Sequence, residues 1–422
     1  MSKQHAICVK LLQQGTIAQM GFNPQSGAFF LVHENGTVRG PVSEFKGLVP
    51  DPDVEKLAAQ NIVRLPSECA DHGNAEKIRQ EVQEFIRAYV DLPPFWESFS
   101  GHYILSTWCF ERLSAIPFFR ILRPPGTGKT TLGKVMSLVC MNCATVSGSI
   151  SAAGLFRTAD ILDPGTMVID ECDQHGHENR DFETVLRSGY ERDVPVQRCN
   201  KDNNFRPEFF RVFGPKVVTA REQFSDDSLE SRCLTFQPTK HRVRRDVPLH
   251  FPDVGYEKAQ VLRNKLLDWR FRNYFNISVN ENELRNLSEP RLAQIAMPVF
   301  STIKDPDYRR EFLEFLGNSG KERIASTEEA LLVSVLSGIA SGINGEAKEV
   351  QVKQIADVAE KKGPEFGFRE KYFTPKRVGG ILRSLDMPGE KRRAGIFVEV
   401  TSQKVRELKE QFPMSEKETP DD

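Results

Sequence analysis

The chain has 422 residues, of which 39% are hydrophobic and 27% are charged, and its formal net charge at pH 7 is −1. These values are typical of an ordinary globular protein and argue against a uniformly basic coat for nucleic acid, although a local basic face remains possible. At about 150 residues per domain, the length predicts two to three domains.

The sequence shows neither an apolar run of about 18 residues nor the apolar core and cleavage site of a secretory signal. We therefore expect a cytoplasmic protein without a membrane partner. The eight cysteines are scattered rather than framed in pairs, which suits a reducing compartment. The CxxC formed by Cys140 and Cys143 has no second pair at metal-ligand spacing, so we interpret both as core thiols.

Residues 1–75 are predicted to form a small β-rich module. Its clearest signal is Asn35-Gly36, a hairpin turn between the apolar runs 28–32 and 37–38. A helix follows over 74–90, because Ile78, Val82, Phe85, Ile86 and Tyr89 recur at helical spacing. A second apolar helix is expected over about 102–115.

The segment 118–131 reads as a buried strand, a Pro/Gly turn and a helix that starts at Lys129. This is the context that a phosphate-binding P-loop requires, because backbone N–H groups and the helix N-terminus surround the phosphates. Arg123 stands where the pattern usually has its first glycine, and any strand-to-helix turn can carry Gly and Pro. The expected ATP-binding residues are Pro125, Gly126, Thr127, Gly128, Lys129, Thr130 and Thr131.

The apolar run 166–169 ends in Asp170-Glu171. After a P-loop, such a pair is typical of an ATPase: Asp170 and the Thr130 hydroxyl would hold Mg²⁺, and Glu171 would orient the attacking water. Cys172, His175 and His177 follow directly, and we interpret them as loop residues rather than zinc ligands.

The next strand candidate, 215–221, places Thr219 where a polar side chain can contact the γ-phosphate or the water, with Arg221 as a weaker candidate. Thr219 is alternatively a plain β-former. Arg232, in the motif 229–232, is a candidate for the arginine that stabilises transition-state charge, commonly from a neighbouring subunit. The alternative for Arg232 is a surface salt bridge.

In this order, the segments 124–130, 168–171, 218–219 and 229–232 resemble AAA+ ATPases, and Arg291 in 287–292 resembles their sensor-2 arginine. The stretch 103–237 most resembles the hexameric helicase-like ATPases of plasmids, prophages and other mobile elements, relatives of the MCM and superfamily-3 helicases. The resemblance covers about 100–412 and implies a ring-forming homo-oligomer, expected to be a hexamer, with Arg232 acting in trans. The side on which Arg291 acts stays open.

Polar residues 200–204 lie between two β-compatible runs and predict a hairpin. In the helicase relatives, a hairpin at this position points into the central channel and contacts DNA. The resemblance therefore implies Lys201 at the tip, with Arg198 and Arg206 near the base, as contacts to single-stranded DNA. The alternative is a solvated loop.

Residues 327–400 follow the order helix, strand, helix, helix, hairpin, which is that of a winged helix. From 361 to 411 there are thirteen Lys/Arg against seven Asp/Glu, so the segment is locally basic. A winged helix can also bind protein. The candidate contacts to duplex DNA are Lys376, Arg377, Arg383, Arg392 and Arg393.

The expected fold class is α/β, with a parallel-sheet AAA+ P-loop core and a helical lid, a small β-rich N-terminal domain and a C-terminal winged helix. The predicted segments are an N-terminal module 1–75, an ATPase core 76–245, a helical lid 246–322, a winged helix 323–412 and a disordered tail 413–422.

The function expected from these features is that of an ATP-driven DNA helicase or translocase in the replication of a mobile element, with Mg²⁺ as cofactor. Two alternatives remain open at this point. One is an AAA+ protein remodeller or loader, and the other is a nucleotide-gated DNA-binding regulator with little turnover, which Arg123 motivates.

Overall fold

The structure is a computed structural model that spans the chain. The residues it describes are 4–5, 9–12, 16–33, 37–40, 48–49, 52–122, 129–172, 179–200, 205–224, 226–237, 244–278, 281–287, 289–325, 327–341, 347–366, 368 and 370–412. They divide into two compact units, one of Met1–Arg285 with Pro290–Arg310 and one of Asn286–Glu289 with Glu311–Asp422.

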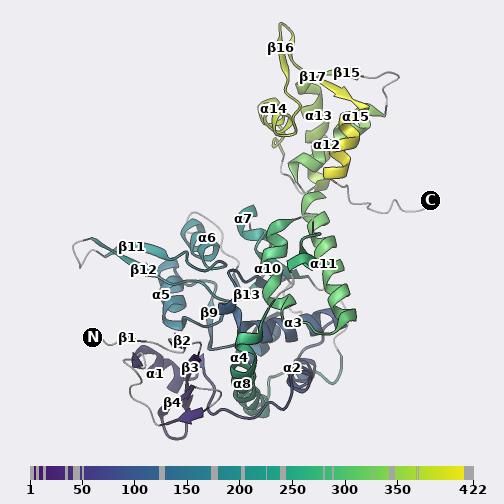
Figure 1. The fold of residues 1–422 in the computed structure, drawn as a ribbon. Coiled ribbons are helices and arrows are strands. Elements are labelled where there is room, and N and C mark those ends of the chain that lie inside the picture. Colours follow the sequence, from purple (N-terminus) through teal and green to yellow (C-terminus); the bar gives the residue numbers. More distant parts are fainter. Residues whose placement is uncertain are drawn as a thin grey trace. The chain divides into compact units, whose positions relative to one another are not determined.

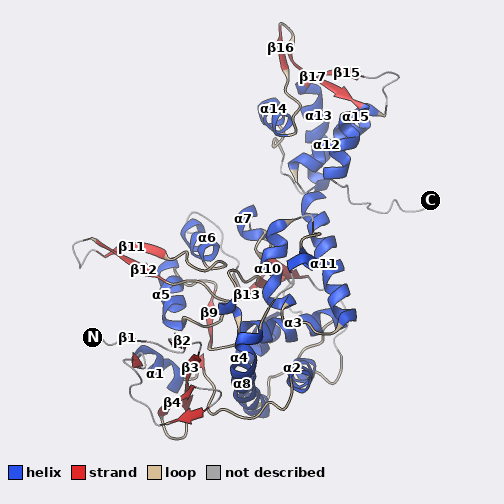
Figure 2. Cartoon of the chain, in the orientation of Figure 1, coloured by secondary structure: helices blue, strands red, loops and turns tan. Residues whose placement is uncertain are grey.

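The first unit is built on a six-stranded, mostly parallel sheet in the spatial order β14-β8-β13-β10-β9-β7. Figure 1 labels two of its strands, β9 and β13, and Figure 2 draws strands in red among the blue helices. Five strands are parallel, and only the edge strand β7 runs antiparallel to its neighbour β9. The strands are β7 (Val63–Arg64), β8 (Phe118–Leu122), β9 (Cys143–Ser147), β10 (Met167–Asp170), β13 (Lys216–Ala220) and β14 (Cys233–Phe236).

β8 and β13 are buried along their whole lengths, as expected of central parallel strands with both faces covered. β13 lies between β8, which leads into the P-loop segment, and β10, which ends in the acidic pair.

Helices surround this sheet. α4 packs on β9, β10 and β13, and α2 and α8 pack on α4, while α3 contacts α10. The helices of this unit are α1 (Pro52–Ala59), α2 (Ala75–Tyr89), α3 (Pro94–Thr107), α4 (Lys129–Val139), α5 (Ala152–Leu162), α6 (Asn179–Ser188), α7 (Asp227–Glu230), α8 (Asp253–Asn273), α9 (Glu281–Leu284) and α10 (Pro290–Phe300). α11 (Pro306–Ala325) begins in this unit and continues into the second.

The N-terminal strands form a four-stranded antiparallel sheet, β2-β3-β4-β5, and a parallel pair, β1-β6. β4 and β5 confirm the predicted hairpin on either side of Asn35-Gly36. The strands are β1 (Gln4–His5), β2 (Val9–Leu12), β3 (Thr16–Asn23), β4 (Ala28–His33), β5 (Thr37–Arg39) and β6 (Leu48–Val49).

Residues 63–72, which the sequence analysis placed in the N-terminal module, bond to the core of the unit. β7 joins the central sheet, and the backbone N–H groups of Ser67 and His72 donate to Asn264 and Asp268 of α8.

The second unit has the order α12, β15, α13, α14, β16, β17, α15, with a three-stranded antiparallel sheet β15-β17-β16. Its core holds Leu331, Leu332, Val378, Val398 and Leu408, among others. The elements are α12 (Glu328–Ala340), β15 (Ala347–Gln351), α13 (Val352–Lys362), α14 (Pro375–Ser384), β16 (Glu390–Arg392), β17 (Gly395–Thr401) and α15 (Ser402–Gln411).

One local prediction was wrong. The apolar helix expected over 102–115 spans Pro94–Thr107, because it is buried almost all round and its start is marked by proline at the first helical position rather than by periodicity. Pro298 lies inside α10 and does not end it, whereas Pro306 opens α11 as a proline at N1 can.

Among the described residues, no helix combines the length and the apolarity that crossing a bilayer would require.

Candidate functional site

The carboxyl ends of β8, β10 and β13 meet at one edge of the sheet, because the three strands are parallel and nearly in register. Ile169 pairs with Val218, and Thr219 pairs with Ile121. Asp170, Thr219 and the chain leaving Leu122 therefore reach the same edge, where an open α/β sheet normally binds its ligand.

Thr219 is fully buried and connects two residues of the acidic motif. Its hydroxyl donates to Oδ1 of Asp170 at 2.6 Å and accepts from the backbone N–H of Glu171 at 2.9 Å. A threonine that was only a β-former would not make this pair of bonds. The hydroxyl fixes the orientation of the Asp170 carboxylate and the path of the chain at Glu171.

Glu171 is exposed and has a φ of +56°. This left-handed backbone is uncommon for a residue with a side chain, and such conformations gather at functional sites. The neighbouring chain passes close by, since a Cβ on Gly148 would lie 2.1 Å from the carbonyl oxygen of Glu171. The structure thus holds the Glu171 side chain in an exposed, conformationally constrained position at the carboxyl edge of the sheet.

The predicted strand and helix around the P-loop segment are confirmed as β8 and α4. Gly133 brings α4 close to the sheet, because a Cβ there would lie 3.2 Å from the Thr219 methyl group. The half-buried Thr131 lies in the first turn of α4. Pro125, Gly126, Thr127, Gly128 and Arg123 lie outside the described residues, as do the side chains of Lys129 and Thr130.

Arg232 lies at the opposite, amino edge of the sheet. Its carbonyl accepts from the N–H of Phe118, the first residue of β8, at 3.0 Å. β8 is five residues long, and a parallel strand rises about 3.3 Å per residue, so the Arg232 backbone lies roughly 15 Å from the end of β8 that leads to the P-loop segment.

Tyr190 brings Arg232 and Arg291 together at this amino edge. The guanidinium carbons of Arg232 and Arg291 lie 4.1 and 5.5 Å from the centre of its ring. Burial and the neighbouring charge of Arg291 both lower the pKa of Arg232. Arg232 donates to Ser228, but its Nε is buried without a hydrogen-bond partner among the described residues. Two cations thus share one aromatic ring, and Arg232 is itself buried.

Two ion pairs hold α7, the short helix directly before Arg232. Glu230 pairs with Arg120, which is fully buried in the middle of β8 and also donates to Thr235 at 2.8 Å. Asp226 caps α7 and pairs with Arg187 of α6 at 2.5 Å. The sequence analysis overlooked this support, although an arginine in the middle of an apolar strand was a visible signal for a buried partner.

The predicted hairpin at 200–204 is confirmed by β11 (Val196–Asn200) and β12 (Arg206–Phe210), which pair antiparallel. Arg206 is exposed. Arg198 is half-buried and turned toward α5, with its guanidinium carbon 5.3 Å from the centre of the Phe156 ring. Lys201 lies outside the described residues.

The candidate DNA-binding residues of the second unit divide into arginines that form ion pairs and basic residues that line a cavity or face solvent. Arg377 pairs with Glu328, and Arg392 pairs with Glu349 and Glu390, which raises the pKa of both guanidinium groups. Lys376 and Arg383, by contrast, line a cavity of about 660 Å³ between α14 and the β16–β17 hairpin. Arg393 is exposed on that hairpin.

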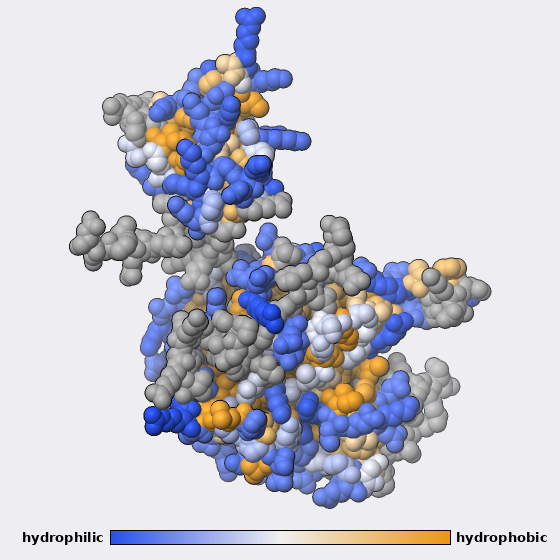
Figure 3. All heavy atoms as spheres, turned by 180° about the vertical axis from the view of Figure 1, so that it is seen from behind, coloured by the Kyte–Doolittle hydropathy of each residue, from blue (hydrophilic) through white to orange (hydrophobic). Residues whose placement is uncertain are grey.

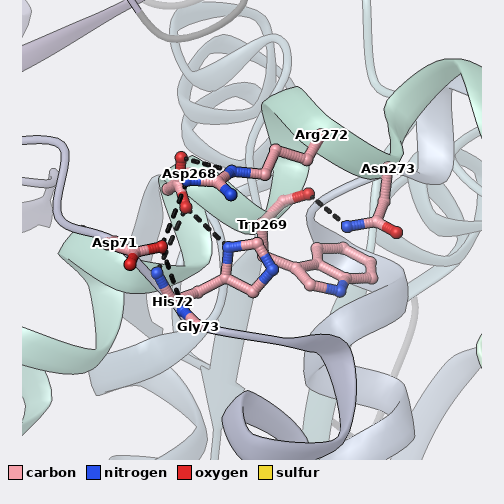
Figure 4. Close-up of polar contacts among 7 residues, drawn as sticks. All are labelled: Asp71, His72, Gly73, Asp268, Trp269, Arg272 and Asn273. Atoms are coloured by element: carbon pink, nitrogen blue, oxygen red, sulfur yellow. Dashed lines mark hydrogen bonds and ion pairs between the residues drawn. The ribbon is translucent and has the colours of Figure 1, made fainter.

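One group in the first unit has the composition of a metal site. The potential ligand atoms of Asp71, His72 and Asp268 lie within 4.8 Å of one another. Figure 4 shows Arg272 already among them: it donates to Asp268 and to Asp71 at 3.1 Å each, while His72 Nδ1 lies 2.6 Å from Asp268. Although burial alone would raise it, the bonds from His72 and Arg272 lower the pKa of Asp268. The positive charge beside these carboxylates thus comes from Arg272 rather than from a metal ion, and the cluster anchors residues 71–73 to α8.

The three cysteines singled out by the sequence analysis fit structural roles. Cys140, Cys143 and Cys172 are buried, and burial raises the pKa of the Cys143 thiol to about 12. Thiols in this state are poor nucleophiles and poor metal ligands. His175 and His177 lie outside the described residues.

Comparison with known proteins gives limited information. No family model and no curated protein matches the chain. The apo structure of the NrS-1 C-terminal region (305–718) aligns over 91% of this chain and 96% of its own, with 10% identity and a TM-score of 0.37. The crystal structure of Cdc6p from Pyrobaculum aerophilum aligns over 77% and 94%, with 12% identity and a TM-score of 0.24.

Proposed function

We propose that this chain is an AAA+ ATPase that binds and hydrolyses ATP at the carboxyl edge of its parallel sheet. The observation that carries the proposal is the hydroxyl of Thr219, which joins Asp170 to the backbone of Glu171 at the edge where α4 follows β8. The acidic pair and the polar residue on the intervening strand thus meet at the edge where β8 ends, and α4, which begins at Lys129, packs on the same strands.

The residues of this edge fit the roles that ATP hydrolysis requires. Lys129 and the 125–128 backbone would contact the phosphates, and Thr130 and Asp170 would hold Mg²⁺, which prefers such oxygen ligands and neutralises phosphate charge. Glu171 would orient the attacking water. Thr219 keeps Asp170 and Glu171 in position, which matters because phosphoryl transfer depends on positioning more than on covalent chemistry.

The distance between the two edges supports a subunit-shared site. Arg232 begins roughly 15 Å from the carboxyl end of β8, and its guanidinium lies over the ring of Tyr190. We therefore assign Arg232 to a neighbour's ATP. Arg291 contacts the same ring, so we assign it to the same neighbour. A closed ring, such as a hexamer, satisfies every such interface.

Two features support DNA as the partner. The second unit has the element order of a winged helix, with Lys376 and Arg383 lining the cavity between α14 and the hairpin. The β11–β12 hairpin presents Arg206 to solvent. We propose that duplex DNA binds at the winged helix and single-stranded DNA at the hairpin, as in a helicase that replicates a mobile element.

The ion pairs of Arg377 and Arg392 favour a second candidate, because they leave fewer cations for phosphates. In that case the chain is an AAA+ remodeller or loader of another protein. ATPase activity stimulated only by a protein partner identifies the remodeller, and negligible turnover with tight duplex binding identifies a nucleotide-gated regulator.

The test combines two variants with an unwinding assay. Lys129→Ala is expected to abolish nucleotide binding, and Glu171→Gln to retain binding while losing turnover. Wild-type protein is expected to form an ATP-dependent ring by sizing and to unwind a forked duplex. Unchanged nucleotide binding in Lys129→Ala would refute the site.

A further inference from the structure

The β11–β12 hairpin has two different faces. Along it, Gln197, Cys199, Pro207 and Phe209 are exposed, and Val196, Arg198, Glu208 and Phe210 are buried or half-buried. The register agrees with this division, since Phe209 pairs with Gln197 and Pro207 with Cys199. Residues directly opposite one another in an antiparallel pair share a face.

The inner face is packed against α5. The ring of Phe210 lies 4.5 Å from that of Phe156, and the guanidinium carbon of Arg157 lies within 5.8 Å of both rings. Arg198 lies over Phe156 on this same side. The inner face therefore fixes the ribbon to the sheet unit and leaves the outer face to solvent.

The hairpin carries two unusually exposed aromatic rings, Phe209 on the outer face and Phe205 in the turn directly before β12. Phe205 is 66% exposed and Phe209 is 60% exposed, which makes them the two most exposed phenylalanines among the described residues. Figure 3 shows hydrophobic spheres on this projecting hairpin, beside hydrophilic ones. Folding gains nothing from leaving two phenyl rings in water, so their position calls for a partner.

We propose that this outer face is a stacking platform for the bases of a single-stranded nucleic acid, with Phe205 and Phe209 as the stacking residues. The proposal rests on the DNA-motor function above and adds base contacts to it. Aromatic rings next to cations are the usual composition of such sites, and stacking is tolerant of sequence because every base has a π-face.

The neighbouring groups suit a nucleic acid better than a second protein surface. Arg206 is exposed at the turn end of the ribbon, on the side opposite Phe209, where it can contact the phosphate backbone. The amide of Gln197, opposite Phe209, can donate to or accept from a base edge. The rings are four positions apart, and four positions of extended chain rise roughly 14 Å, which is about the length of four stacked bases. A duplex hides its base faces, so the ligand is a single strand.

The experiment compares two probes of equal length: an oligo-dT strand and an abasic strand with the same phosphates. Wild-type protein is expected to bind the dT strand more tightly. Phe205→Ala and Phe209→Ala are each expected to weaken dT binding about tenfold and to leave abasic binding unchanged. Phe205→Trp and Phe209→Trp are expected to keep the dT affinity, and Phe205→Leu and Phe209→Leu to lose it.

Matched controls separate stacking from charge. Phe275→Ala, which removes a 43% exposed ring outside the hairpin, is expected to change neither affinity. Arg206→Ala is expected to weaken both probes equally and to lower the salt dependence.

A second measurement uses the native Cys199, which is exposed and belongs to the outer face. The dT strand is expected to slow alkylation of this thiol, followed by peptide mass spectrometry, and the abasic strand to slow it less. Equal binding of both probes by wild-type and alanine variants would overturn the platform while leaving the DNA motor intact. A loss of oligomer size without a loss of dT affinity would overturn it in favour of a protein interface.

If the wild type binds neither strand, the DNA function and the platform fail together. The ATPase site is tested separately, by comparing nucleotide binding of the wild type and Lys129→Ala.

Discussion

The two edges of the central sheet are built in opposite ways. At the carboxyl edge, the acidic pair is tied together, because Thr219 bonds to both Asp170 and Glu171. At the amino edge, Arg232 and Arg291 share one tyrosine ring, and the Nε of Arg232 is buried without a hydrogen-bond partner among the described residues.

This difference indicates which kind of ligand each edge of the sheet could bind. Under the proposed function, the carboxyl edge would offer oxygen atoms to a cation and a carboxylate to a water, whereas the amino edge would offer the cations Arg232 and Arg291 to an anion. The proposed ligand, a magnesium-bound triphosphate, would use both, and a single protomer cannot bring its own two edges together. The comparison therefore predicts half-sites that become complete only between subunits.

Removing the amino-edge donor should have the largest effect. Arg232→Ala is expected to lower ATP turnover by about 10³-fold, because an arginine finger stabilises transition-state charge, and to leave nucleotide binding nearly unchanged. Steady-state hydrolysis and binding of a fluorescent nucleotide measure the two.

A mixture of two inactive variants tests whether the active site is shared between subunits. Lys129→Ala retains Arg232, and Arg232→Ala retains Lys129, so the mixture is expected to recover part of the ATPase activity that each variant lacks alone. A mixture as inactive as its components would place Arg232 outside the active site of a neighbour.

Loosening the carboxyl edge should have a smaller effect. Thr219→Val keeps the shape of the side chain and removes the hydroxyl that joins Asp170 to Glu171. Losing such a supporting bond typically costs 10- to 100-fold in metal affinity or activity, so we expect turnover to fall by about that factor and to need more Mg²⁺. Thr219→Ser retains the hydroxyl and should stay near wild type. Equal activity of the Val and Ser variants would reduce Thr219 to a β-former.

Part of this site was predictable from the sequence because its signals are local. The strand and helix around the P-loop segment, the acidic end of β10 and the position of Thr219 all follow from short motifs. The same holds for α2, in which Ile78, Val82, Phe85, Ile86 and Tyr89 are all buried as their spacing predicts.

The remaining features depend on partners that are distant in the sequence. Arg120 meets Glu230 only after β14 has paired with β8, and Arg377 is neutralised by Glu328 of another helix. Periodicity also failed for α3, which is buried on nearly every side. The two faces of the hairpin required its register, which turn residues alone do not define.

The Arg120–Glu230 pair tests whether the amino edge depends on the strand that leads to the P-loop. Arg120→Met leaves the Glu230 carboxylate without its buried partner. Because Glu230 is 22% exposed, we expect a loss of roughly 2 kcal/mol in the free energy of unfolding, below the 3–5 kcal/mol typical of a fully buried pair. Chemical unfolding measures this value.

Lys56→Met is the surface control for that measurement, since Lys56 and its partner Asp53 are both exposed, and it should change stability by less than about 0.5 kcal/mol. In the mixing assay, Arg120→Met should restore less ATPase activity to Lys129→Ala than a subunit that retains Arg120. If Arg120→Met keeps both wild-type stability and full restoration of activity, other contacts hold α7.

The smallest expected effect is a pH dependence that acts through α10, the helix that begins next to Arg291. His102 of α3 contacts Thr302, just beyond α10, at 3.0 Å. Burial, reinforced by the charge of Arg79, lowers the pKa of His102 from 6.5 to about 3. Below pH 6.5 the unfolded chain therefore binds a proton at this histidine that the folded chain does not bind. The free energy of unfolding then falls by about 1.4 kcal/mol for each unit by which the pH is lowered.

Urea unfolding at pH 7.0 and 5.5 measures this dependence, and in His102→Gln its slope should be smaller by this amount. It should be unchanged in His250→Gln, whose histidine is exposed. The same slope in wild type and His102→Gln would mean that another group titrates, and that α10 is not held by a neutral imidazole.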